Sequence, residues 1–151
     1  MYRPRVLIVE DHKENAEAIA SFIRFAYPDW ELEICDRGAE AVSRSLENPA
    51  DVVVLDIALA DDTNGLEVVK GLWDGGLRQK PKIIFATALG NRAFRGPRVG
   101  RPWVEQLNEP ERNMISAFFE KPYSWHAFLT ALAKAAGVPP SDKIQLIPDD
   151  E

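Results

Sequence analysis

Four short apolar runs constrain this chain most, because each of them ends on polar residues of a different chemical kind. The runs cover residues 6–9, 52–55, 83–86 and 117–119. They are continuous and mostly rich in β-branched residues, which is typical of strands buried on both faces of a parallel sheet. The polar residues that follow them are Glu10 with Asp11, then Asp56, then Thr87, and finally Glu120 with Lys121. Ligands of such sheets bind beyond the carboxyl ends of the strands, so we expect these side chains to share one crevice.

Helical periodicity fills the intervals between the runs. Apolar residues recur at three- and four-residue spacing around residues 16–23, 39–46, 66–73 and 125–136. Ser124 and Gly137 are suited to cap the two ends of the last of these helices. The alternation predicts an α/β fold, a doubly wound parallel sheet with right-handed crossovers and helices on both faces.

Two segments depart from this alternation. Residues 90–113 contain several Pro and Gly residues and no long periodic run, so we expect an irregular stretch there. Residues 138–151 form an acidic tail, which we expect to be frayed or loosely docked. The tail is too short to make an output domain.

Composition excludes several classes of protein. The 151 residues carry a formal net charge of −6, which argues against general nucleic-acid binding. No apolar stretch approaches the roughly 20 residues of a membrane span, and the first apolar run is too short for a signal peptide. We therefore expect a cytoplasmic protein without membrane contact. The one cysteine, Cys35, cannot form an intrachain disulfide and is expected to pack in the core.

The polar strand ends suit phosphoryl chemistry. Glu10, Asp11 and Asp56 offer the oxygen ligands that a hard divalent cation such as Mg²⁺ prefers. One carboxylate can act as a nucleophile and become an aspartyl phosphate. Metal and the Lys121 ammonium can stabilise charge on the phosphoryl oxygens, and the Thr87 hydroxyl can donate a hydrogen bond to them.

Taken in order, these motifs resemble the receiver domain of two-component response regulators. The matching elements are Val-Glu-Asp after the first run, Asp56 after the second, Thr87-Ala88 after the third and Glu-Lys-Pro after the fourth. The resemblance covers roughly residues 5–136. It implies a flavodoxin-like, five-stranded parallel sheet with strand order 2-1-3-4-5. The chain would then be a single-domain, chemotaxis-regulator-like receiver over residues 1–137, with an atypical segment at 88–116.

The resemblance also assigns the reacting and metal-binding groups. Asp56 would be the phosphoacceptor. Glu10, Asp11, Asp56 and the backbone carbonyl of Ala58 would hold Mg²⁺, or Mn²⁺ in its place. Lys121 would contact the phosphoryl group.

A second set of implied roles concerns the conformational switch. Thr87 would be the switch hydroxyl, and Phe118 would be the switch aromatic that turns inward when Thr87 moves toward the phosphate. The bond between Lys121 and Pro122 would be cis, as family members tend to have.

The chain departs from the family pattern in two places. Gly65 stands nine residues after Asp56, one more than usual, so the intervening loop is expected to be longer. Thr87 and Phe118 are 31 positions apart, which is a much longer separation than the family has. The region of the fourth helix is thus enlarged.

The enlarged region carries a periodic set of cations. Its arginines recur at every third residue, as Arg92, Arg95, Arg98 and Arg101. In a polyproline-II segment, with three residues per turn, they would share one edge. We hypothesise that this strip, with Trp103, binds a partner. A solvated loop whose arginines pair with local acids is an equally open interpretation.

The preferred function is a phosphoacceptor switch rather than an enzyme with a diffusible product. A histidine kinase or histidine phosphotransfer protein would phosphorylate Asp56 in a Mg²⁺-dependent reaction. The surface of residues 88–123 would then change and be bound by a separate effector protein. We expect a monomer or weak dimer.

Two rivals remain. One is a phosphorylation-independent interaction module that keeps the fold. The other is a phosphohydrolase, but such enzymes typically need a second Asp two residues after the nucleophile, and Ala58 stands there.

Overall fold

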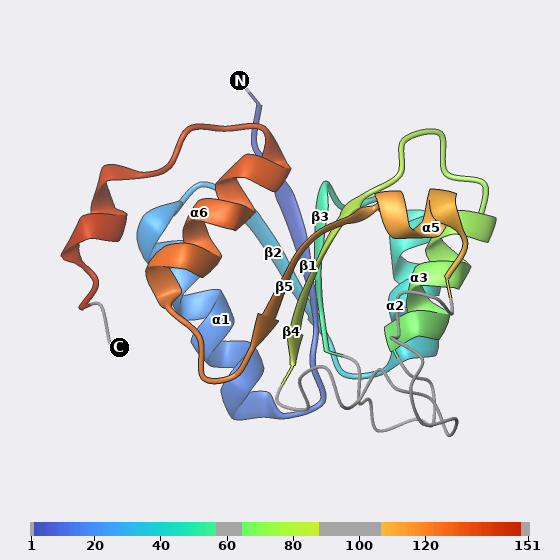
Figure 1. The fold of residues 1–151 in the computed structure, drawn as a ribbon, viewed down its shortest axis with the longest axis horizontal. Coiled ribbons are helices and arrows are strands. Elements are labelled where there is room, and N and C mark those ends of the chain that lie inside the picture. The colour runs from blue at the N-terminus through green and yellow to red at the C-terminus, as the bar shows by residue number, and fades with distance from the viewer. Residues whose placement is uncertain (1, 57–64, 88–106, 149–151) are drawn as a thin grey trace.

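A five-stranded parallel sheet forms the centre of the molecule (Figure 1). The computed structural model describes residues 2–56, 65–87 and 107–148. The strand order is β2-β1-β3-β4-β5, as predicted for a flavodoxin-like fold. The strands are β1 (Arg5–Val9), β2 (Glu31–Cys35), β3 (Val52–Leu55), β4 (Lys82–Thr87) and β5 (Ile115–Glu120). The helices are α1 (Lys13–Ala26), α2 (Gly38–Glu47), α3 (Gly65–Asp74), α5 (Glu109–Asn113), α6 (Trp125–Ala136) and the 3-10 helix η2 (Asp142–Leu146).

The two faces of the sheet are covered by different helices. Helices α1 and α6 lie on one face, and α2, α3 and α5 lie on the other (Figure 1). Successive strand residues point to opposite faces, so Ile8 and Val54 pack toward α1 and α6, whereas Leu7 and Val53 pack toward α2 and α3. Burial on both faces explains why these strands are continuously apolar. Cys35 is buried in the second of these cores, as predicted.

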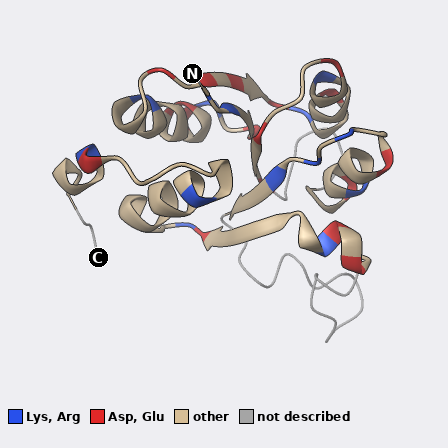
Figure 2. Cartoon of the chain, turned by 90° about the horizontal axis from the view of Figure 1, so that it is seen from above, with Lys and Arg blue, Asp and Glu red and all other residues tan. Residues whose placement is uncertain are grey.

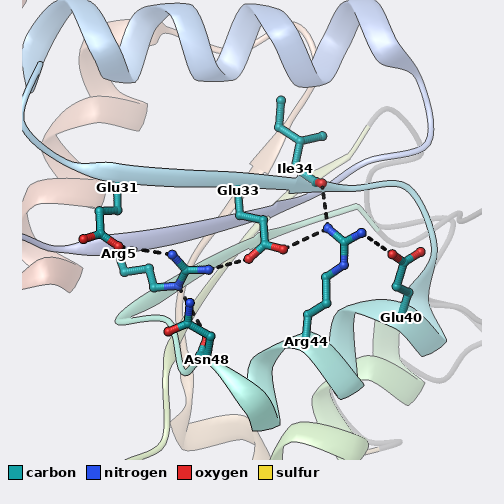
Figure 3. A network of polar contacts seen from close by, with 7 residues as sticks. All are labelled: Arg5, Glu31, Glu33, Ile34, Glu40, Arg44 and Asn48. Atoms are coloured by element: carbon teal, nitrogen blue, oxygen red, sulfur yellow. Dashed lines mark hydrogen bonds and ion pairs between the residues drawn. The ribbon is translucent and has the colours of Figure 1, made fainter.

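Charged residues are concentrated on the helices and on the edge strand β2, and the middle of the sheet carries few (Figure 2). At that edge an ion-pair network joins β1, β2 and α2 (Figure 3). We call it the edge network, and its members are Arg5, Glu31, Glu33, Glu40 and Arg44. Its two guanidinium groups both contact the Glu33 carboxylate, which ties β1 to α2 across the intervening strand.

Local capping signals set the helix ends in the carboxyl-terminal half. The Ser124 hydroxyl accepts a hydrogen bond from the Ala127 backbone N–H at 3.3 Å and begins α6. Gly137 ends it in the left-handed conformation, with φ 75°. Both caps were predicted. Helix α5, within the stretch expected to be irregular, begins at a capping box in which Asn108 and Glu111 exchange hydrogen bonds.

The β4–β5 pairing contains one extra residue. Ile83 pairs with Ile115, whereas Ile84 pairs with Ala117, so Ser116 is bulged out. After the bulge Thr87 pairs with Glu120. The bulge therefore sets the register at the ends of β4 and β5. It places Lys121 directly after the residue that pairs with Thr87.

The segment after α6, expected to be frayed or loosely docked, is docked on the body over residues 138–148 rather than frayed. Ile144 and Ile147 are buried in the core that α1 and α6 share. The Ser141 backbone N–H donates to the Tyr27 hydroxyl at 2.9 Å. The apolar surface that these two isoleucines bury stabilises the docked position of the segment. None of the helices among the described residues has the length and apolar character to cross a membrane.

Candidate functional site

The register of the central strands brings the predicted polar residues together. Val9 pairs with Leu55, so the residues that follow them, Glu10 and Asp56, leave the sheet side by side. The Asp56 backbone N–H donates to the Val9 carbonyl at 3.0 Å, and the Glu10 backbone N–H donates to the Cys35 carbonyl at 3.0 Å. Both acidic residues are thus anchored by main-chain hydrogen bonds of the sheet.

The side chains at this edge form a compact acidic site, which we define as Glu10, Asp11 and Asp56. One ligand atom from each of these residues and from His12 lies within 4.8 Å of the other three. Glu10 is 2% exposed and Asp56 is 7% exposed. Three carboxylates in so small a volume repel one another unless cations offset their charge.

Lys121 supplies the cation within this part of the structure. Its backbone N–H donates to the Thr87 carbonyl at 2.8 Å, which fixes the start of the loop after β5. Its Nζ donates to Glu10 Oε1 at 2.7 Å. The following bond to Pro122 is cis, as the resemblance to receiver domains implied. The Lys121 ammonium therefore pairs with one carboxylate of the acidic site, that of Glu10.

The charge balance shows in the acidity of Glu10. Burial, followed by the hydrogen bond and the charge of Asp56, raises the pKa of Glu10 from 4.5 to about 7. Lys121 acts in the opposite direction but does not restore the ordinary pKa value. Glu10 Oε2 is buried and accepts no hydrogen bond from any described residue, and Asp11 Oδ1 is buried next to Nδ1 of His12, at 3.1 Å. A buried oxygen without a donor, next to two further carboxylates, fits a divalent cation such as Mg²⁺.

The two predicted switch residues lie on neighbouring strands. Thr87 ends β4 and is fully buried. Phe118 on β5 is half-buried and packs on Phe85, with the ring centroids 6.4 Å apart. The structure thus brings Thr87 to the acidic site through Lys121 and places Phe118 on the same sheet two residues from that end of β5.

Cavities open on both sides of the acidic site. One of about 210 Å³ lies between α1 and the loop after β5, and Asn15, Lys121, Tyr123 and Trp125 help to line it. Another of about 420 Å³ is bounded by the loops after β1 and β2 and shares Glu10 and Asp11 with the site. Open space therefore adjoins Lys121 on one side and Glu10 and Asp11 on the other.

Sequence reasoning missed two neighbours of the acidic site. Tyr123 follows the Glu-Lys-Pro motif, and burial, together with the charges of Glu10 and Asp56, raises its pKa above the ordinary tyrosine range. His12 directly follows Asp11, and its ring is part of the cluster around the carboxylates. The available signals were their positions directly beside recognised motifs.

Several predicted site residues lie outside the described part of the chain. They are Ala58, Arg92, Arg95, Arg98, Arg101 and Trp103. The metal-binding role of the first and the partner-binding role of the others stay predictions.

A family model of the response regulator receiver domain matches residues 6–97. The chain belongs to this family. Receiver domains are phosphoacceptors of two-component signalling that work with histidine kinases and effectors and bind Mg²⁺ in an acidic pocket. The matched residues include Glu10, Asp11, Asp56 and Thr87, whereas Phe118 and Lys121 follow them.

Solved receiver structures share the fold of this receiver domain. The signal receiver domain of a putative LuxO repressor protein from Vibrio parahaemolyticus aligns with TM-score 0.70 and 21% identity, covering 96% of this chain and 95% of that one. The receiver domain of a Pseudomonas aeruginosa sensor histidine kinase, with a magnesium ion in its active-site cleft, gives 0.67 and 18%, covering 90% and 99%. The response regulator domain of Thermotoga maritima CheB gives 0.68 and 23%, covering 92% and 100%. No curated protein sequence matches the chain.

Proposed function

We propose that this receiver domain is a phosphorylation switch in which Asp56 accepts a phosphoryl group from a phosphohistidine donor. The observation that carries the proposal is the convergence of Asp56, Glu10 and Asp11 within 4.8 Å, with Lys121 bonded to Glu10. A nucleophilic carboxylate, a cation site and an ammonium are the groups that phosphoryl transfer to an aspartate requires.

The chain's own residues divide the work. Asp56, held by its backbone bond to Val9, presents a carboxylate oxygen at the end of β3. Glu10 and Asp11 would hold Mg²⁺ with Asp56, and the ion would neutralise charge on the phosphoryl oxygens. Lys121, now on Glu10 Oε1, lies at the edge of the same site and can contact an incoming phosphoryl oxygen.

The output of the switch would pass through Thr87 and Phe118. Thr87 is fixed to Lys121 by its carbonyl, so a phosphoryl group that contacts Lys121 lies close to the end of β4. Movement of Thr87 would change the space available to Phe118, which packs on the neighbouring strand. The surface of residues 88–123 would thereby change and be bound by an effector protein.

Acetyl phosphate and Mg²⁺ test the proposal. We expect intact-mass measurement to show a gain of one phosphoryl group in the wild type and none in Asp56→Asn. Glu120→Gln, a change of a neighbouring exposed carboxylate outside the acidic site, is the matched control and should still be phosphorylated. Absence of any mass gain in the wild type with acetyl phosphate, with no Mg²⁺ binding, favours the phosphorylation-independent interaction module instead.

A finer part of the proposal assigns the effector contact to the arginine strip with Trp103. Its support is the three-residue spacing of the cations in an acidic chain. Charge reversal of Arg95 and Arg98 together should weaken effector binding, measured at low salt. Unchanged affinity would remove the strip from the proposal and leave the phosphoacceptor role untouched.

A further inference from the structure

His12 occupies a position where its side chain has no capping role. It is the N-cap residue of α1, where Ser, Thr, Asp or Asn would normally accept a hydrogen bond from the first turn. The His12 side chain makes no such bond. It is 71% exposed, so neither core packing nor helix capping accounts for it.

The imidazole lies at the rim of the acidic site. Nδ1 of His12 is 3.1 Å from Oδ1 of Asp11. The ligand atoms of His12, Asp11, Glu10 and Asp56 lie within 4.8 Å of one another. Ligand atoms of a tetrahedral Zn²⁺ ion lie about 2.1 Å from the metal and about 3.4 Å from one another, so these four atoms would have to move closer by up to about 1.4 Å to share one ion.

A buried carboxylate oxygen of Glu10 supports a cation site independently of the histidine. Glu10 is buried almost completely, and its Oε2 accepts no hydrogen bond, while Lys121 binds only the other oxygen. Asp11 Oδ1 is also buried, and the contact it makes is the one with His12 Nδ1. An anionic oxygen that is buried and without a donor is costly unless a cation binds it.

We propose that His12 adds an imidazole nitrogen to the three carboxylates, so that the site also binds Zn²⁺ or a similar late transition-metal ion. The inference rests on the proposed function, because it uses the carboxylates that would hold Mg²⁺. Hard Mg²⁺ prefers oxygen ligands, whereas imidazole favours zinc, nickel and copper. The nitrogen therefore changes which ion the site selects.

The two ions would exclude each other, since both need Glu10, Asp11 and Asp56. A bound transition-metal ion would occupy the position from which Mg²⁺ supports phosphoryl transfer. Availability of such an ion would then limit phosphorylation of Asp56, in addition to the kinase.

Calorimetric titration of the metal-free, full-length chain with Zn²⁺ and, separately, with Mg²⁺ tests the inference. We expect His12→Gln to lower the ratio of Zn²⁺ to Mg²⁺ affinity about tenfold. Asp11→Asn should weaken both ions. The matched control is His126→Gln, which removes the other histidine of the chain, a residue that contacts the Ile147 carbonyl far along the sequence. That variant should keep the wild-type ratio.

Cys35 needs a control of its own, because zinc also binds thiolates and Cys35 lines the cavity beside the site. Cys35→Ala should keep Zn²⁺ affinity. Loss of zinc binding in that variant, the same ratio in His12→Gln as in wild type, or an equal fall in His126→Gln would each overturn the inference. Circular dichroism of every variant verifies the fold. None of these titrations depends on phosphorylation, so a chain that fails with acetyl phosphate can still pass this test.

Discussion

The edge network and the acidic site contain the same number of carboxylates but differ in how these carboxylates are paired with cations. In the edge network, Glu31, Glu33 and Glu40 each pair with a guanidinium group of Arg5 or Arg44 (Figure 3). In the acidic site Lys121 pairs with Glu10, yet the pKa of Glu10 rises to about 7. The charges of the edge network are paired with guanidinium groups, whereas Glu10 keeps one buried oxygen without a donor among the described residues, which suits a cationic ligand.

Burial makes that difference matter energetically. The carboxylates of the edge network are partly or largely exposed to water, which screens them. Glu10 is almost fully buried, so its charge is neither hydrated nor fully paired. Removing one partner should therefore cost much more in the acidic site than in the edge network.

Replacing the cation of the acidic site should have the largest effect. Lys121→Met leaves Glu10 buried without its ammonium, and we expect the free energy of unfolding at pH 8 to fall by about 2 kcal/mol. Proton uptake by Glu10 limits the penalty. Urea denaturation of the metal-free protein measures it. In a Glu10→Gln background the same change should cost much less, and an equal cost in both backgrounds would show that Lys121 acts through other contacts.

The pH dependence should be the next largest effect. The folded-state pKa of Glu10 is raised, so the stabilisation is complete below its unfolded value of 4.5 and is lost as the pH rises through about 7. Between pH 6 and 8 the metal-free protein should lose about 1 kcal/mol of unfolding free energy from this group. Thermal unfolding should also show a larger Mg²⁺ stabilisation at pH 8.

Glu10→Gln is the reference for that profile, because it keeps the shape of the side chain and removes its proton equilibrium. The difference between wild type and this variant isolates Glu10 from other titrating groups. A difference that stays constant between pH 6 and 8 would contradict the raised pKa.

Neutralising the predicted phosphoacceptor should change stability in the opposite direction. Asp56→Asn removes the charge that raises the pKa of Glu10, so we expect unfolding free energy in metal-free buffer to increase by about 0.5 kcal/mol at pH 8. Glu40→Gln, the matched change in the edge network, should lower it slightly, because it removes a paired charge. A fall in both variants would show that the interactions of Asp56 stabilise the fold more than its repulsion of Glu10 destabilises it.

The sequence was sufficient to predict the sheet and the meeting of Glu10, Asp11, Asp56 and Lys121, because apolar runs define strands and parallel strands end at one edge. It could not predict the Lys121 to Glu10 bond, which joins residues 111 positions apart and depends on the bulge at Ser116. That bulge has no signal of its own in the apolar pattern.

Other misses have local causes. Asn108 and Glu111 carry a capping-box spacing, but a helix of five residues is too short to show apolar periodicity. Ile144 and Ile147 stand in a largely polar tail, and their burial depends on packing against α1 and α6. The contact between the His12 ring and the Asp11 carboxylate depends on the backbone at the start of α1, not on residue type.

The smallest effect is expected where charges are most completely paired. Arg44→Met removes two ion pairs and a hydrogen bond to the Ile34 carbonyl, yet Glu33 keeps its pair with Arg5. Arg44 is 38% exposed, so we expect a loss of about 0.5 kcal/mol in urea denaturation, shrinking further in 0.5 M salt by about half. The loss from Lys121→Met should respond much less to salt, since its partner is buried. If Arg44→Met lowers the free energy of unfolding as much as Lys121→Met at every salt concentration, the two clusters do not differ in pairing and burial. The contrast would then no longer support the acidic site as a ligand site.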